Sequence, residues 1–128
     1  MNCSEETRAP TEQADPPDHL SAEHHVIGGG RVVTLRGEID HDVQGVLRGA
    51  LLNQGGAVPE RIVADLSGVT FMDSSGINVF VAAHRQTTQA AGWIRIADAR
   101  PAVRRVLQVT GVDTFVSCHL SVEEALGA

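Results

Sequence analysis

The chain has 128 residues, of which 42% are hydrophobic and 20% charged, and its formal net charge is −6. This length allows one domain with one hydrophobic core, and no apolar run approaches the roughly 18–20 residues that a membrane span needs. Six acids and one arginine lie in residues 1–23, so the remainder is nearly neutral and no basic face favours nucleic acid as a partner. Because no basic start leads into an apolar stretch, no secretory signal is expected, and the chain is predicted to be cytoplasmic without membrane contact.

Residues 1–22 are predicted to be a disordered acidic tail. They carry Pro10, Pro16 and Pro17 and few apolar side chains. Such a segment buries too little surface to offset the entropy lost on ordering. We therefore expect the folded domain to occupy residues 23–128.

The folded part begins with two β-prone runs, residues 24–27 and 31–36, whose glycine-rich separation predicts a hairpin. A helix is predicted over 41–53, with Asp40 as its N-cap and Gly55-Gly56 ending it. The near-continuous apolar run at 62–66 is typical of a strand covered on both faces. The remaining elements alternate: a helix over 75–91, a strand over 93–97, a helix from Pro101 to Gly111, a strand over 114–116, and a terminal helix opened by Ser121.

Strands separated by helices imply mostly parallel pairing through right-handed crossovers. We predict an α/β domain with a mixed sheet of four or five strands, packed by four helices. Cys118 stands near Val116 and Leu120 and is predicted to be a buried small apolar residue without a reactive role.

The junction Phe71-Met72-Asp73-Ser74-Ser75-Gly76-Ile77 joins the central strand to the next helix. A helix start has free N–H groups and a partial positive charge, so it accepts an anion, including a phosphate on a serine. The simpler interpretation is that Asp73 or a serine caps the helix while Gly76 permits close packing. Spacing alone favours that simpler interpretation.

The sequence motifs give little support for an enzymatic or a metal site, and the chain is predicted not to be an enzyme. Ser74 and Ser75 lack the glycine that precedes a nucleophile elbow, and His84 lies too far along the helix to act as their base. A receiver-type phospho-acceptor at Asp65 requires a lysine, and the chain contains none. No metal signature appears among the histidines, which stand at positions 19, 24, 25, 41, 84 and 119.

Two motifs together resemble a known family. Gly37-Glu38-Ile39-Asp40-His41, followed at a distance by Asp73-Ser74-Ser75-Gly76, is similar to the bacterial anti-sigma-factor antagonists of the STAS family. The segment from Ala102 to Gly111 also resembles the family's third helix. The resemblance covers about residues 24–128 and implies a single STAS-like domain.

The resemblance implies that the protein acts by partner switching. Unmodified, such an antagonist binds an anti-sigma factor that is also a serine kinase, and the sigma factor is released. The kinase, which carries the ATP and magnesium, phosphorylates the first serine of the motif, here Ser74, and a PP2C-type phosphatase resets it. Asp40 matches a family aspartate that supports phosphorylation, so Asp40, Asp73, Ser74, Ser75 and Gly76 are the expected partner-binding residues, and no cofactor is expected on this chain.

Two alternatives remain open at this stage. The domain could be a non-switching STAS scaffold in a larger signalling assembly, with Ser74 never modified. It could instead bind a small ligand such as a nucleotide at the helix start, although Trp93 and three phenylalanines offer little to stack a base.

Overall fold

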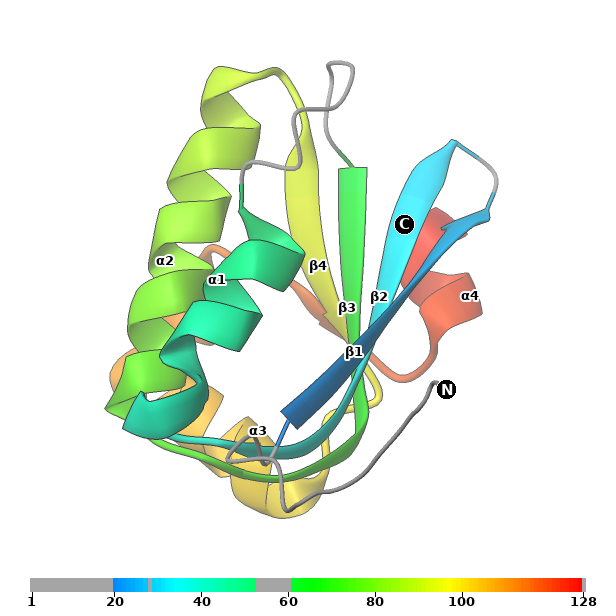
Figure 1. The fold of residues 1–128 in the computed structure, drawn as a ribbon. Coiled ribbons are helices and arrows are strands. Elements are labelled where there is room, and N and C mark those ends of the chain that lie inside the picture. The colour runs from blue at the N-terminus through cyan, green and yellow to red at the C-terminus, as the bar shows by residue number, and fades with distance from the viewer. Residues whose placement is uncertain (1–19, 28, 53–60, 128) are drawn as a thin grey trace, which may run out of the picture.

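The computed structural model describes residues 20–27, 29–52 and 61–127. Its elements follow the predicted order, a hairpin and then alternating helices and strands (Figure 1). The strands are β1 (Leu20–Ile27), β2 (Gly30–Ile39), β3 (Arg61–Met72), β4 (Trp93–Ala97) and β5 (Cys118–His119). The helices are α1 (Gln44–Leu51), α2 (Ser74–Gln89), α3 (Pro101–Thr110) and α4 (Val122–Gly127), with short 3-10 helices at His41–Val43 and Val112–Thr114.

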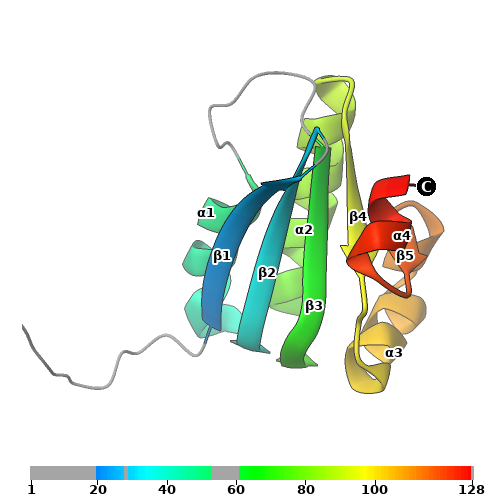
Figure 2. The same ribbon diagram turned by 90° about the vertical axis from the view of Figure 1, so that its right-hand side faces the viewer.

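The strands form one mixed sheet in the order β1-β2-β3-β4-β5. β1 and β2 are the antiparallel hairpin, and every later pairing is parallel. Helices α1 and α2 cover one face of the sheet, α4 lies on the other face beside β4, and α3 lies at the end toward which β2 and β3 run (Figures 1 and 2). The predicted α/β class and mixed sheet are confirmed, with five strands and four helices in the described part of the chain.

The central strands are buried on both faces. Val33 and Ala64 belong to the main core beneath α1 and α2, where Phe80 is the largest fully buried side chain. The adjacent residues Val32 and Val63 face the other way, into a smaller cluster beneath α4. This double coverage explains why the sequence of β3 begins as a near-continuous apolar run.

Two boundaries differ from the sequence-based prediction. β1 begins at Leu20, which is buried against the core, so the folded part starts ahead of the predicted boundary at residue 23. The helix predicted over 41–53 opens as a 3-10 turn and continues as α1 to Leu51. Residues 1–19 of the predicted tail, and the predicted stop at Gly55-Gly56, lie outside the described residues.

The strand predicted at 114–116 is wrong. The backbone N–H groups of Phe115 and Val116 both donate to the carbonyl of Val112, at 3.1 and 2.9 Å, so this segment turns instead of extending. Pairing with β4 starts where Ile96 N–H donates to the carbonyl of Ser117 at 2.9 Å. The edge strand therefore lies a few residues later, at Cys118–His119.

The prediction that Cys118 is buried is also wrong, because the residue is exposed. It lines a hollow between α3 and β5 together with Arg104, Asp113 and His119. Partial burial raises the pKa of the Cys118 thiol, the Asp113 carboxylate raises it further, and Arg104 lowers it. A raised pKa favours the neutral thiol, which is the less nucleophilic form.

The histidines show how the hairpin separates neighbouring side chains. Arg31 Nη1 lies 3.0 Å from His24 Nδ1, while His25 Nε2 lies 3.8 Å from a carboxylate oxygen of Glu23. His84 is partly buried on α2, and its ring centroid lies 4.9 Å from that of Phe115. No group of three or more metal-ligating side chains gathers among the described residues.

No helix in the described ranges is long and apolar enough to cross a membrane.

Candidate functional site

The two sequence motifs meet where β2 and β3 end. Ile39 pairs with Met72 in the parallel register, and the N–H of Asp73 donates to the carbonyl of Ile39 at 3.1 Å. Asp40 and Asp73 therefore follow directly from two adjacent strand ends. The sequence predicts this proximity only if the strand ends align, and the register shows that they do. We call this end of the domain, residues 37–43 and 69–78, the switch end.

Both aspartates cap a helical segment. Asp73 Oδ1 accepts the N–H of Ser75 at 2.8 Å, which holds the first turn of α2. Asp40 Oδ1 accepts the N–H of Asp42 at 3.0 Å and begins the 3-10 turn. Capping by side-chain oxygens satisfies N–H groups that have no partner within the helix. The prediction that these aspartates cap helical segments is thus confirmed. Capping does not prevent the same carboxylates from contacting a partner.

Ser74 is the first residue of α2 and is exposed, whereas Ser75 is partly buried. The capping carboxylate takes the N–H of Ser75, so the cap holds the backbone next to Ser74 in place. Of the two serines, Ser74 is the more exposed to solvent.

Gly76 is buried, and its role is to let α2 begin close to the sheet. A Cβ atom at this position would lie 2.7 Å from Cγ2 of Ile39 and 2.8 Å from Cγ of Met72. Both neighbours are themselves buried side chains. Gly76 therefore contributes to the site by positioning the backbone around Ser74, and its buried position offers little surface to a partner.

A second glycine shapes the other motif. Gly37 has a φ of +118°, which glycine adopts without steric cost. It lies at an irregularity in the β2–β3 register, where Gly37 pairs with Val69 but Glu38 pairs with Phe71. The extra residue in β3 changes which side chains face solvent at the end of the strand.

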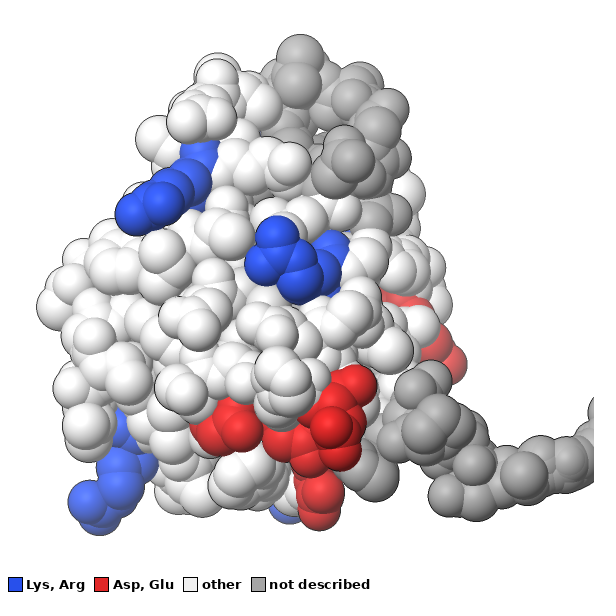
Figure 3. Space-filling view, turned by 60° about the vertical axis from the view of Figure 1, so that its left-hand side comes forward, with Lys and Arg blue, Asp and Glu red and all other residues white. Residues whose placement is uncertain are grey.

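Apart from His41, the ionisable side chains within the two segments of the switch end are carboxylates. Residues 37–43 and 69–78 contain no arginine or lysine, and their carboxylates belong to Glu38, Asp40, Asp42 and Asp73. Figure 3 shows acidic side chains at the lower end of the molecule, with basic side chains at the same end toward the lower left. Arg36 directly precedes the first segment, and α3 at the same end of the domain carries Arg104 and Arg105, so the negative charge is confined to the two segments themselves.

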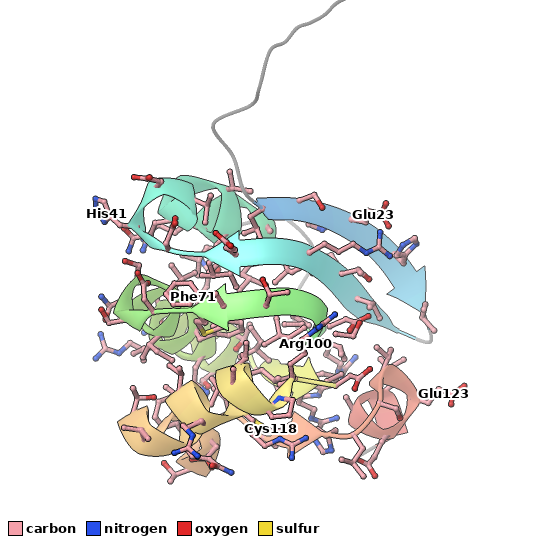
Figure 4. All side chains as sticks on the ribbon, turned by 90° about the horizontal axis from the view of Figure 1, so that it is seen from below. Glu23, His41, Phe71, Arg100, Cys118 and Glu123 are labelled. Carbon is pink, nitrogen blue, oxygen red and sulfur yellow. The ribbon has the colours of Figure 1, made fainter. Side chains whose placement is uncertain are left out.

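Phe71 is a feature of this end that the sequence analysis did not single out. The residue is 48% exposed, although Val69 and Met72 in the same strand are buried. In the view from below, Phe71 lies at the end of β3 and His41 at the start of the neighbouring helical turn (Figure 4). The sequence signal for this feature is an aromatic residue close to the serine motif. Strand alternation starting from Val69, however, predicts that Phe71 is buried.

Comparisons with known proteins give the family. A family model for the STAS domain matches residues 21–125. An anti-sigma F factor antagonist from Paenibacillus polymyxa is 32% identical over 97 residues, which are 73% of this chain and 79% of that protein. The crystal structure of an anti-sigma factor antagonist from Mycobacterium paratuberculosis superposes with a TM-score of 0.74 at 29% identity, covering 89% of this chain and 97% of that one.

A further solved structure, of the anti-sigma factor antagonist SpoIIAA in its unphosphorylated form, has a TM-score of 0.65 at 26% identity and covers 83% of this chain and 93% of that one. The domain match spans nearly all of the described residues and includes both motifs. The chain therefore belongs to the STAS-domain family of anti-sigma factor antagonists.

Proposed function

We propose that the unmodified protein binds an anti-sigma factor through the switch end and thereby frees a sigma factor, and that phosphorylation of Ser74 ends this binding. The observation that carries the proposal is the exposed Ser74 at the start of α2, directly after Asp73, whose strand end aligns with the strand end that precedes Asp40. In this scheme the anti-sigma factor is also the serine kinase and brings ATP and magnesium. A PP2C-type phosphatase restores the hydroxyl. The protein is thus a ligand and a substrate, with Ser75 and Gly76 supporting the backbone of the site.

The geometry explains how phosphorylation could act on a partner without unfolding the domain. A phosphate adds a charge of about −1.5 to −2, and the positive end of α2 tolerates it. The N–H of Ser75 is already bound to Asp73, and Ser74 itself is exposed. The dianion would therefore stand at the surface, where its bulk, hydration and charge oppose a partner fitted to a hydroxyl.

The descriptions of two similar proteins are consistent with this proposal. The Paenibacillus protein is an anti-sigma F factor antagonist, and the SpoIIAA structure is described as an unphosphorylated form, which implies that a phosphorylated form of that protein exists. These descriptions belong to those proteins. They agree with the site in this chain, where a serine is presented in a position suited to modification.

Phosphorylation of Ser74 is the direct test. We expect incubation with the cognate anti-sigma factor, ATP and magnesium to add one phosphoryl group to the intact protein, and peptide mapping to place it on Ser74. Ser74→Ala should abolish the mass increase, while the matched variant Ser75→Ala should retain it. Modification that maps to Ser75, or that persists in Ser74→Ala, would contradict the assignment.

Asp40 is expected to support the phosphorylation reaction. Asp40→Asn removes a negative charge from the switch end but keeps a side-chain oxygen that can accept the N–H of Asp42. The rate of phosphate incorporation should therefore fall at least tenfold while the thermal midpoint stays close to that of the wild type. Asp113→Asn, which neutralises an exposed carboxylate in the hollow beside α3, is the control. Equal rates for the two variants would remove Asp40 from the proposed site.

A further inference from the structure

The switch end carries an exposed aromatic side chain among its carboxylates. The described chain exposes six large apolar side chains, and Phe71 is the one that lies at the switch end; the others are Val26, Ile27, Val109, Phe115 and Leu120. The register irregularity after Gly37 places Phe71 opposite Glu38, whose side chain is also exposed. The fold therefore presents an apolar ring with a carboxylate at its side.

The backbone around Phe71 is held in place. Thr70 Oγ1 donates to the carbonyl of Gly37 at 3.4 Å on one side, and the N–H of Asp73 donates to Ile39 on the other. Buried Met72 anchors the strand between them. An aromatic side chain on a rigid backbone loses little conformational entropy when it enters a partner, and aromatic residues surrounded by polar rims dominate binding energy at many interfaces.

We propose that Phe71 is the apolar anchor of the anti-sigma factor interface, and that it enters a pocket on that partner rimmed by arginine or lysine side chains. This inference rests on the proposed function, because it concerns the same partner. The chemistry of the rim follows from charge complementarity, since the carboxylates of Glu38, Asp40 and Asp42 stand beside Phe71 in the two segments that form the switch end.

A basic rim is compatible with release on phosphorylation, because the two contacts are at different places. A kinase must bring the γ-phosphate of its nucleotide against the hydroxyl of Ser74, so the partner presents negative charge at that point. A phosphate on Ser74 meets the remaining nucleotide phosphates. Phe71 is the second-last residue of β3, whereas Ser74 is the first residue of α2, so in this proposal the basic rim contacts the strand ends and the nucleotide faces the helix start.

The test measures dissociation constants for the cognate anti-sigma factor with its bound nucleotide, by calorimetry at two salt concentrations. Phe71→Ala should weaken binding at least tenfold with little change in the thermal midpoint. Phe115→Ala is the matched control: Phe115 is 43% exposed, and it contacts His84, which lies ten residues along α2 from Ser74, about 15 Å at 1.5 Å per residue. Glu38→Arg should weaken binding and reduce its salt dependence, whereas Glu123→Arg on α4 should not.

The outcomes separate this inference from the proposed function. If Phe71→Ala binds within twofold of the wild type while Ser74→Asp binds poorly, the proposal that Phe71 is the anchor is wrong, and the proposal that Ser74 controls binding is retained. If Ser74→Asp binds as well as the wild type, the switch is wrong, and a tenfold loss in Phe71→Ala still supports the anchor. If the unmodified wild-type protein does not bind the anti-sigma factor, both proposals are overturned. Self-association in light scattering that disappears in Phe71→Ala would assign this surface to a second copy of the chain and overturn the partner proposed here.

Discussion

Ser74→Asp is expected to weaken binding of the anti-sigma factor about a hundredfold, or about 2.7 kcal/mol. The substitution places a carboxylate where the partner would meet a hydroxyl, in a region that already holds the carboxylates of Asp40, Asp42 and Asp73. It leaves the capping bond from Ser75 N–H to Asp73 in place, so the fold should be unaffected. Ser74→Ala should bind like the wild type and remain bound after incubation with ATP and magnesium.

The comparison requires a variant that adds the same charge elsewhere on α2. Gln89→Glu serves this purpose, because Gln89 is exposed and ends the helix far from Ser74. Surface plasmon resonance with immobilised anti-sigma factor would give the affinities of all three variants. Similar affinities for Ser74→Asp and Gln89→Glu would show that charge at Ser74 does not control binding, and the proposed switch would have to be abandoned.

The arrangement of the two motifs could be predicted because it depends on strand topology. Parallel strands joined through a helix place their carboxyl ends at the same edge of a sheet, so the residues after β2 and β3 had to lie near each other. Capping by Asp40 and Asp73 could be predicted because short polar side chains at helix starts accept local N–H groups. Close packing at Gly76 followed from the same junction. These features follow from local sequence patterns and from the order of strands and helices along the chain.

The exposed Phe71 and the late edge strand could not be predicted from such patterns. Strand alternation assigns Phe71 to the same face as buried Val69, and only the register irregularity at Gly37 reverses this. The start of β5 depends on a turn closed by Val112, whose two backbone bonds outweigh the β-propensity of the segment after it. Both results arise from pairing between distant segments, so they require the assembled sheet.

Gly76→Ala is expected to destabilise the domain relative to an alanine placed elsewhere in a helix. The new Cβ would lie 2.7 Å from Cγ2 of Ile39 and 2.8 Å from Cγ of Met72, and overpacking of this kind costs about 1–3 kcal/mol. Alanine also gains up to about 1 kcal/mol of helix propensity over glycine. Gly45→Ala in α1 receives that gain without a clash, because a Cβ at Gly45 would meet no neighbouring side chain or strand within 4 Å.

The difference between the two variants therefore isolates the contact between the start of α2 and the strand ends. Urea unfolding should place Gly76→Ala below Gly45→Ala by about 1–3 kcal/mol in the free energy of unfolding. If the clash instead moves α2 away from Ile39, the cost in stability falls, but Ser74 moves relative to Asp40 and the rate of Ser74 phosphorylation falls with it. A Gly76→Ala variant that matches Gly45→Ala in stability and the wild type in phosphorylation rate would show that this close approach neither supports the fold nor positions the serine.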